Sequence, residues 1–339
     1  MPSLPEIVPN RDLGPDAIRQ AIAGLLDPQV SEDAKAEFLV RLREKGESES
    51  EIAGFVQALL EHAVQPSLPR HSLPGPLIDI CGTGGDGLEL FNISTASMFV
   101  LAAAGACVVK HGNRAITSRC GGADVLEELG VRIDADPSSL GERLATTGLA
   151  FLFAPLYHPA FKVIAPVRKR LAAEGKSSIF NLLGPLLNPV SPDFQLVGVH
   201  SANLTPMYAG VLQKLGRTRA WAIHGCGTDE LTLAGPSVGH EATPSRVRPL
   251  VIHPDEAGLP IAPNESLRGG DRSKNAAMIQ DILSNTLLGP PREVVVLNTA
   301  AALVVCGLST DLAAGARTAS ACIADGRALA KLQAMRDCS

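Results

Sequence analysis

Seven short apolar or β-branched runs alternate with helix-like segments after residue 76, and this alternation constrains the fold more than any other feature. Strands that alternate with helices predict a mostly parallel sheet with helices packed against it. Right-handed crossovers then bring the loops that follow the strands to one edge of the sheet, where ligands usually bind. The predicted strands are residues 77–81, 106–110, 150–153, 195–200, 219–224, 248–252 and 293–297.

The N-terminal seventy residues show the periodicity of amphipathic helices instead. Ser31 is placed to cap one helix that Gly46 would end, and Ser48 with Glu51 forms a capping box for the next helix. Four prolines in residues 65–76 interrupt the pattern, so we interpret this stretch as a linker. We therefore predict a helical region followed by an α/β region, in a chain whose 339 residues suffice for two packed regions.

Charge and cysteine usage limit the class of protein. The net charge of −5 argues against nucleic acid as the main partner, and it means that an anionic substrate needs a local cluster of cations or a metal ion. The seven cysteines are scattered without a Cys-x-x-Cys pair, which predicts neither a disulfide framework nor a zinc site and favours a reducing cytoplasm. We expect no secretory signal and no membrane-spanning segment, because no apolar run has the necessary length or flanks.

The stretch CGTGGDGLELFNIST, residues 81–95, places four glycines in six positions directly after the first predicted strand. Glycines allow a tight turn that exposes several backbone N–H groups, and such groups bind phosphate oxygens. Asn92, Ser94 and Thr95 mark the start of a helix whose positive end would face the same space. The stretch matches neither the dinucleotide fingerprint nor the P-loop, and the glycines alone favour a plain tight turn followed by a helix cap.

Two further segments follow predicted strands and shift this interpretation towards a phosphate site. Residues 110–114 supply Lys110 and Arg114, which are either surface charges or, beside a glycine loop, groups that face an anion. Asp229 and Glu230 follow the strand 219–224, and adjacent carboxylates at a strand end suit Mg²⁺. An isolated Asp-Glu pair is typical of a solvated turn, but with two phosphate loops on the same sheet edge the metal site is favoured.

The basic stretch 162–176 contains Arg168, Lys169 and Arg170 in succession. It is compatible with a solvated helix face, a nucleic-acid-binding stripe, or one buried arginine with exposed neighbours. Three successive residues point in different directions around a helix, so at most one or two of them can serve a single site.

Several motifs, in order along nearly the whole chain, resemble those of the anthranilate phosphoribosyltransferase family, a family of nucleoside phosphorylase-type transferases. The order of many motifs is much more specific than any one of them. The matching segments are residues 45–47 (KGE), 82–86 (GTGGD), 92–95 (NIST), 110–114 (KHGNR), 123–127 (ADVLE), 166–168 (PVR), 180–189 (FNLLGPLLNP), 229–230 (DE), 269–271 (GGD) and 275–276 (NA).

The resemblance implies an α/β fold with a small all-helical domain, a larger α/β domain with a mostly parallel central sheet, and an active site in the hinge cleft. The small domain would comprise residues 1–70 plus about 165–190. The larger domain, which would bind phosphoribosyl pyrophosphate, would comprise residues 75–164 and 191–339. A homodimer formed through the helical domain is also implied.

The resemblance implies transfer of a phosphoribosyl group from phosphoribosyl pyrophosphate to the amine of anthranilate, a step of tryptophan biosynthesis that releases pyrophosphate and uses Mg²⁺. Lys110 and Arg168 would be catalytic: Lys110 would stabilise the departing pyrophosphate, and Arg168 would pair with the carboxylate of the aromatic acid. Substrate binding is implied for Gly82, Gly85, Asp86, Asn92, Ile93, Ser94, Thr95, Lys110, His111, Gly112, Asn113, Arg114, Ser118 and Arg168.

For the metal, the resemblance implies that Ser94 with Glu230 binds one Mg²⁺ and that Asp229 with Glu230 binds a second. Asn113 would meet the aromatic acid beside Arg168. We expect His111 to order its loop rather than to act as a catalyst.

The sequence departs from the family pattern at three places. Leu90 stands where the family has Thr, Gly122 where it has Ser, and Ser177-Ser178 where it has Arg-Thr. Two hydroxyls near the pyrophosphate are therefore missing, each with an expected cost of about 1 kcal/mol unless water replaces it. The alternatives are a related transferase with another aromatic acceptor, a nucleoside phosphorylase, and a nucleic-acid-binding relative that uses residues 162–176 without this activity.

Overall fold

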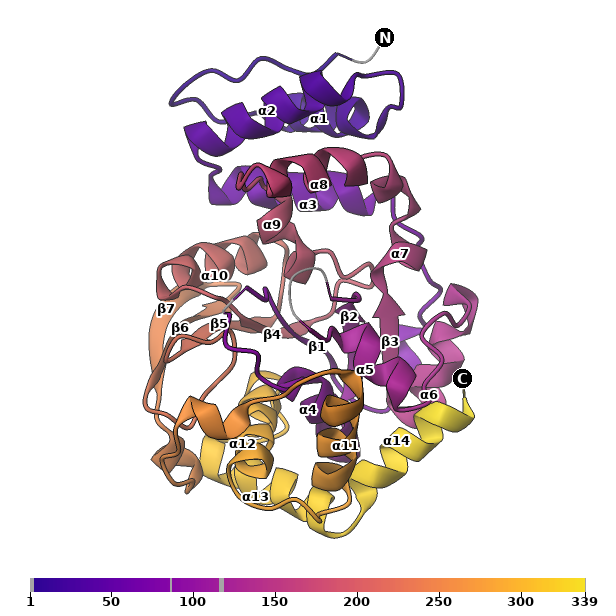
Figure 1. Ribbon diagram of the computed structural model, residues 1–339, viewed down its shortest axis with the longest axis vertical. Coiled ribbons are helices and arrows are strands. Elements are labelled where there is room, and N and C mark those ends of the chain that lie inside the picture. Colours follow the sequence, from indigo (N-terminus) through magenta and orange to yellow (C-terminus); the bar gives the residue numbers. More distant parts are fainter. Residues whose placement is uncertain (1–2, 86, 116–118, 339) are drawn as a thin grey trace.

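The computed structural model describes residues 3–85, 87–115 and 119–338. Within them the chain forms a helical lobe and a wider lobe built on a central sheet, which we call the sheet lobe (Figure 1). The helical lobe contains α1 (Pro15–Leu26), α2 (Glu32–Lys45), α3 (Glu49–Leu60) and α8 (Ala165–Ala173).

The predicted signals define the ends of α2 and α3. The Ser31 hydroxyl accepts a hydrogen bond from the backbone N–H of Ala34, and Gly46 ends α2 with a φ of 84° that favours glycine. Ser48 and Glu51 form the predicted capping box at the start of α3. The sequence therefore predicted these helix boundaries from side-chain chemistry alone.

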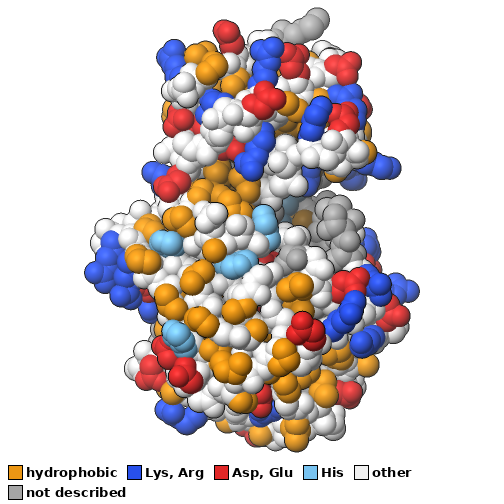
Figure 2. Space-filling model, turned by 60° about the vertical axis from the view of Figure 1, so that its left-hand side comes forward, with side chains coloured by type: hydrophobic (Ala, Val, Ile, Leu, Met, Phe, Trp, Pro, Cys, Tyr) orange, Lys and Arg blue, Asp and Glu red, His pale blue; other side chains and the backbone are white. Residues whose placement is uncertain are grey.

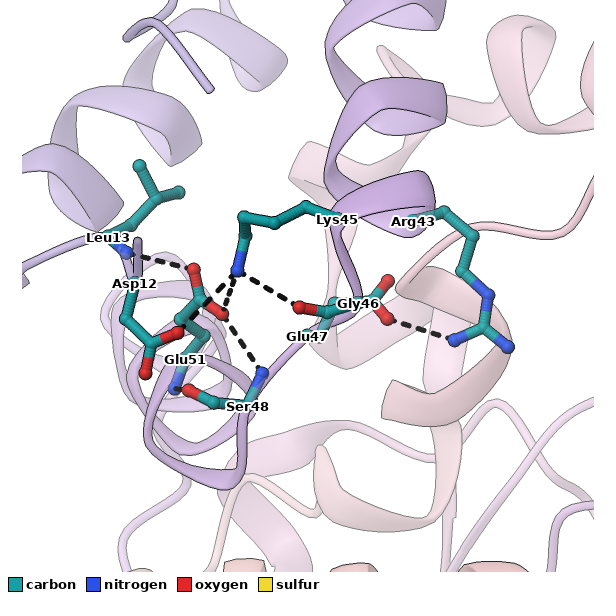
Figure 3. Close-up of polar contacts among 8 residues, drawn as sticks. All are labelled: Asp12, Leu13, Arg43, Lys45, Gly46, Glu47, Ser48 and Glu51. Atoms are coloured by element: carbon teal, nitrogen blue, oxygen red, sulfur yellow. Dashed lines mark hydrogen bonds and ion pairs between the residues drawn. The ribbon is translucent and has the colours of Figure 1, made fainter. Parts of the chain in front are cut away.

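The turn between α2 and α3 is held by a buried ion pair (Figure 3). Lys45 Nζ lies 2.7 Å from Glu51 Oε2, and both side chains are almost completely buried. Glu51 Oε2 also accepts from Ser48 N, and its Oε1 accepts from Leu13 N at 2.9 Å. Glu51 thus joins the segment before α1 to the α2–α3 turn.

α8 returns to the helical lobe from the second half of the sequence. Arg170 Nη1 contacts Asp33 Oδ1 of α2 at 2.7 Å, and Leu171 packs in the same hydrophobic cluster as Phe55 of α3. The same cluster continues to Tyr208 in α10 (Thr205–Lys214) of the sheet lobe. This core runs without a break from the helical lobe to the sheet, so it marks no boundary between two domains. The predicted domain boundaries therefore stay a prediction.

The sheet lobe contains seven strands in the order β3-β2-β1-β4-β5-β6-β7. The pairs from β3 through β5 are parallel, whereas β6 and β7 extend the sheet in antiparallel fashion. The predicted fold class, a mostly parallel sheet with a small helical unit, is therefore confirmed. The strands are β1 (Leu77–Gly82), β2 (Cys107–Gly112), β3 (Leu149–Phe153), β4 (Phe194–Gly198), β5 (Arg219–Gly225), β6 (Ser237–Thr243) and β7 (Arg246–Ile252).

Helices cover both faces of the sheet, which explains why the parallel strands are buried along most of their length. α10 (Thr205–Lys214) packs between β5–β7 and α3, on the side of the helical lobe. The opposite face carries α4 (Ile93–Ala103), α11 (Arg272–Leu283), α12 (Pro290–Val305), α13 (Leu312–Ala324) and α14 (Arg327–Asp337). The shorter helices are α5 (Gly122–Glu128), α6 (Leu140–Thr147), α7 (Ala154–Tyr157) and α9 (Phe180–Leu183).

One strand prediction was wrong, and one strand was missed. Residues 293–297 lie inside α12, whose residues are buried almost all round, so the valine-rich run reflects burial rather than a strand. β6 was missed because its sequence, SVGHEAT, has no apolar run. No helix among the described residues is long and apolar enough to cross a membrane.

Candidate active site

Three segments that follow strands meet at one edge of the sheet. The glycine loop after β1 contacts the acidic pair through Gly84 N, which donates to Asp229 Oδ2 at 2.7 Å. The first turn of α4 contacts the same pair through Ser94 N, which donates to Glu230 Oε1 at 3.2 Å. Lys110, in β2, donates from Nζ to Ser94 Oγ at 3.0 Å. The sequence predicted this convergence from strand order alone.

Glycine is required where the acidic pair approaches the strands. A Cβ at Gly82 would lie 2.2 Å from Asp229 Oδ2, and a Cβ at Gly198 would lie 1.4 Å from the Asp229 carbonyl oxygen. Gly84 and Gly85 have φ values of 66° and 89°, which turn the loop after β1. The predicted binding residue Asp86 lies outside the described residues, as does Ser118.

The start of α4 faces this loop. Asn92 precedes the helix, and Ile93 is its first residue. The Asn92 side chain donates to the carbonyl of Cys120 at 3.1 Å and accepts from Asn275 Nδ2 at 3.0 Å, so it ties α4 to α11. Thr95 is buried one turn into the helix. The positive end of the helix dipole at this first turn favours an anion, and in this structure Ser94 N already donates to the Glu230 carboxylate.

Lys110 places a buried positive charge at the centre of the site. Its Nζ donates to the carbonyl of Ile80 at 2.6 Å as well as to Ser94 Oγ. Only 5% of the residue is exposed. The ammonium group is therefore fixed between β1 and α4, close enough to Glu230 to influence that carboxyl group.

Glu230 and Asp229 form a half-buried acidic pair. Burial, and then the neighbouring charge of Asp229, raise the pKa of Glu230 well above its ordinary value. A divalent cation would relieve this repulsion, and the carboxylates with the Ser94 hydroxyl are the oxygen ligands that Mg²⁺ prefers. The described residues contain no cluster of three or more His, Cys, Asp or Glu side chains that could hold a metal ion.

His111 begins a series of rings that leads to the helical lobe. Burial, and then the neighbouring His158, lower the pKa of His111 to about 3, so its ring is neutral at physiological pH. The His111 and His158 ring centroids lie 5.2 Å apart, those of His158 and Phe161 5.1 Å, and those of Phe161 and Phe180 5.8 Å. We call these four residues the aromatic series. Sequence reasoning missed its last three members, for which only the quoted motifs around residues 166–168 and 180–189 gave a signal.

Arg168 lies at the end of the aromatic series. Its guanidinium carbon is 5.3 Å from the centre of the Phe180 ring, and burial lowers the pKa of the side chain. Within residues 3–85, 87–115 and 119–338 it has no carboxylate partner. A partly buried guanidinium without an anion is suited to bind a ligand carboxylate.

Other predicted binding residues are engaged within the loop after β2. Arg114 pairs with Glu127 at 2.8 Å and lies over the Phe153 ring. Asn113 accepts from Arg114 N through its side chain and from Ala123 N through its carbonyl, and it orders the loop. Gly112 is required because a Cβ there would lie 2.8 Å from the Phe151 ring.

Two of the departures from the family pattern lie beside these groups. A Cβ at Gly122 would lie 3.4 Å from Thr95 Oγ1 and 3.9 Å from Lys110 Cε, so a hydroxyl at this position would face the site. Leu90 pairs with Arg268 in an isolated bridge and packs against the core. Ser178 is buried, and its N–H donates to Asn181 Oδ1 at the start of α9.

The sequence matches two family models. Residues 3–63 match the helical bundle domain of the glycosyl transferase family, and residues 74–329 match its a/b domain. Among curated relatives, the anthranilate phosphoribosyltransferase of Chloroflexus aggregans is 43% identical over 331 residues, covering 97% of this chain and 95% of that protein. The chain belongs to the anthranilate phosphoribosyltransferase family.

Solved structures of the anthranilate phosphoribosyltransferase family have the same fold. The enzyme from Thermus thermophilus superposes with a TM-score of 0.89 at 38% identity, covering 96% of both chains. The Saccharomyces cerevisiae enzyme in complex with PRPP and Mg gives a TM-score of 0.86 at 27% identity, covering 96% of this chain and 93% of that one. The same yeast enzyme in complex with 4-fluoroanthranilate gives 0.85 at 26% identity, covering 96% and 92%.

Proposed function

We propose that this protein transfers the phosphoribosyl group of phosphoribosyl pyrophosphate to the amine of anthranilate and releases pyrophosphate, as a pentosyltransferase of tryptophan biosynthesis. The observation that carries the proposal is the convergence of the glycine loop, Lys110 and the acidic pair at one sheet edge. Family membership supports it, and the yeast relative is solved in complex with PRPP and Mg and with 4-fluoroanthranilate.

In the reaction, the amine nitrogen of anthranilate forms a bond to C1 of the ribose while the bond from C1 to the pyrophosphate oxygen breaks. The electron pair of the broken bond leaves with pyrophosphate, and the new C–N group loses one proton to solvent. An aromatic amine is largely unprotonated at neutral pH, so no strong base is needed. The main task of the protein is to stabilise negative charge on the leaving group.

The residues of the sheet edge perform this task electrostatically. Lys110 supplies a fixed ammonium group, the N–H group of Gly85 would supply a hydrogen-bond donor, and the start of α4 supplies the positive end of its dipole. Ser94, Asp229 and Glu230 would hold Mg²⁺, which when bound neutralises charge on the pyrophosphate. Burial of Lys110 strengthens its interaction with a bound anion.

Arg168 and the aromatic series suit the acceptor. Arg168 offers a guanidinium to the anthranilate carboxylate, and the rings of Phe161 and Phe180 offer faces and edges to its aromatic ring. His111 stays neutral and so leaves the positive charge of the site to Arg168 and Lys110. Bringing the two substrates together from the two lobes would supply much of the remaining rate.

The basic stretch 162–176 does not favour a nucleic-acid-binding function. Arg170 is paired with Asp33, Lys176 is paired with Glu174, and Arg168 is mostly buried. Two of these charges are thus paired, which leaves Lys162 and Lys169 as the other exposed lysines rather than a continuous basic stripe. A homodimer formed through the helical lobe and a cytoplasmic location stay predictions.

The test is an assay that follows the loss of anthranilate fluorescence with phosphoribosyl pyrophosphate and Mg²⁺. The substitution Arg168→Ala is expected to lower kcat/KM for anthranilate roughly 30-fold, corresponding to about 2 kcal/mol for a lost charged hydrogen bond, with the KM for phosphoribosyl pyrophosphate nearly unchanged. The double substitution Asp229→Ala with Glu230→Ala is expected to abolish activity. Lys169→Ala, at an exposed neighbour of Arg168, is the matched control and should behave as the wild type.

The proposal fails if the wild-type protein does not consume anthranilate, or if activity survives both Arg168→Ala and the double substitution. Consumption of another aromatic or heterocyclic acceptor in place of anthranilate would support the related transferase.

A further inference from the structure

We infer that His224 is a positioning residue that holds the acidic pair against the glycine loop. His224 lies near the end of β5, where its ring bridges two segments. Its Nδ1 lies 2.8 Å from the carbonyl oxygen of Val199, and its Nε2 lies 3.3 Å from the backbone nitrogen of Gly227. The first segment follows β4 and the second is the turn that leads to Asp229 and Glu230.

The two contacts define the state of the ring. A carbonyl oxygen only accepts hydrogen bonds, so Nδ1 carries the proton that is donated to Val199. The N–H of Gly227 only donates, so Nε2 keeps its lone pair and accepts. The neutral ring with its proton on Nδ1 therefore satisfies both contacts, and the fixed distance between the two nitrogens sets the distance between the segments.

The turn that His224 supports is an unfavourable one for its sequence. Gly225 and Thr228 exchange two backbone hydrogen bonds around Cys226 and Gly227, which have φ values of 36° and 88°. The left-handed backbone is sterically unfavourable for Cys226 because this residue has a Cβ. Such a conformation persists when surrounding contacts impose it, and here those contacts are His224 at Gly227 and Asn264, whose Nδ2 donates to the carbonyl of Cys226 at 3.0 Å.

His224 also belongs to a closed set of hydrogen bonds around the site. Next to Val199, the backbone N–H of His200 donates to Thr83 Oγ1 at 3.1 Å, which fixes the start of the glycine loop. The neighbouring Gly84 N donates to Asp229 Oδ2, and Asp229 follows the turn that His224 holds. Hydrogen bonds therefore link the end of β4 to the glycine loop, the glycine loop to the acidic pair, and the acidic turn back to the end of β4. His224 makes the last of these links.

Loss of His224 should therefore weaken the binding of the metal and the diphosphate rather than that of the aromatic acceptor. Residues that orient metal ligands typically change metal affinity 10- to 100-fold when they are removed. The aromatic series and Arg168 take no part in these hydrogen bonds, so the binding of anthranilate is expected to change little. The role assigned to His224 rests on the proposed magnesium site.

Three full-length variants separate the two contacts of His224. His224→Ala removes both. His224→Gln reaches the position of Nε2 with an amide oxygen that can accept from Gly227, whereas His224→Asn reaches only the position of Nδ1. The matched control is His240→Ala, because His240 lies on the neighbouring β6 and makes one comparable contact, to Thr205 Oγ1 at 2.9 Å, away from the acidic turn.

The measurements are calorimetric binding of phosphoribosyl pyrophosphate in the presence of Mg²⁺, hydrogen exchange of the amides in residues 225–230, and the KM for anthranilate. We expect His224→Ala and His224→Asn to weaken Mg²⁺-dependent binding at least about tenfold and to speed exchange in 225–230, with the KM for anthranilate within about twofold of the wild type. His224→Gln, which keeps the contact to the acidic turn but not the one to Val199, should recover part of the affinity, and His240→Ala should bind as the wild type does.

Binding of His224→Ala within about twofold of the wild type would overturn the inference, and so would an equal loss in His224→Ala and His240→Ala. If His224→Ala does not fold, the affinities of His224→Gln and His224→Asn are compared instead. Equal affinities of these two variants would refute the proposed role of His224. Failure of the proposed function is distinguishable, because the wild type would then not bind phosphoribosyl pyrophosphate with Mg²⁺, whereas hydrogen exchange would still report whether His224 holds the turn.

Discussion

Asp79 has an unusual position for a carboxyl group, fully buried in the middle of β1. Its oxygens accept from Asn188 Nδ2 at 2.9 Å and from His111 N at 3.4 Å. Burial nevertheless dominates and raises the pKa from 3.8 to about 6, against the lowering effect of these hydrogen bonds. Asp79 therefore binds its proton more tightly in the folded chain than in the unfolded chain.

This shift predicts how stability depends on pH. The contribution of Asp79 is complete below about pH 4 and is lost as the pH rises through about 6, in total about 3 kcal/mol for a shift from 3.8 to about 6. Asp79→Asn removes the titration. We expect the free energy of unfolding of the variant, relative to the wild type, to rise by about 2 kcal/mol between about pH 4.5 and 7.5, as measured by urea denaturation.

Asp134→Asn is the control for this experiment, because the Asp134 side chain is 68% exposed and its replacement should leave the pH dependence of the wild type unchanged. Identical pH dependence in Asp79→Asn and in the wild type would show that the carboxyl group is not the source of the effect.

Single residues show where sequence reasoning succeeds and where it stops. The prediction of proximity among Lys110, Asp229 and Glu230 agrees with the contacts at the sheet edge. It was possible because the alternation of elements indicates a parallel sheet, and such a sheet places its strand ends at one edge. Arg114 pairs with Glu127, a contact that the loop sequence did not reveal, and its assignment to the substrate stays a prediction. Ring contacts such as that of His111 with His158 likewise depend on tertiary packing.

At the scale of elements, the α2–α3 turn is the part of the helical lobe whose stability depends most clearly on one contact. Lys45 and Glu51 are both buried, and Glu51 also satisfies the N–H groups of Ser48 and Leu13 (Figure 3). Removing one partner of a buried pair leaves an uncompensated charge, which costs much more than the pair itself contributes.

Lys45→Met is therefore expected to lower the free energy of unfolding by about 3 kcal/mol, because the Glu51 carboxylate stays buried without its cation. Chemical denaturation followed by circular dichroism measures this change. Arg41→Ala breaks an exposed pair with Glu37 in the same helix and should cost less than about 0.5 kcal/mol. Equal losses in the two variants would contradict the account of the buried pair.

Element prediction failed where burial hides periodicity. The run 293–297 contains three successive valines, which favour a strand, but α12 packs between α4, α13 and the sheet and is apolar on nearly every side. The opposite error occurred in β6, whose Glu241 is buried against Arg219 and Arg248. Helices with caps, such as α2 and α3, were predicted correctly because capping is a local interaction.

At the scale of the whole molecule, the two substrates would be held by different lobes. The residues that would bind the diphosphate lie at the sheet edge, whereas Arg168 lies in α8 of the helical lobe. Figure 2 shows the molecule narrowing between the lobes, with hydrophobic and histidine side chains gathered there. The aromatic series crosses this region from β2 to α9, so movement of the lobes would change the distance between donor and acceptor.

The central claim is that backbone amides, one ammonium group and a metal-binding pair together neutralise a diphosphate. The most direct test is a crystal structure of the protein with phosphoribosyl pyrophosphate and Mg²⁺. We expect the diphosphate within hydrogen-bond distance of Gly85 N and Lys110 Nζ, and Mg²⁺ bound by Ser94, Asp229 and Glu230. A diphosphate bound away from the glycine loop, or a metal ion that neither Asp229 nor Glu230 contacts, would contradict the account.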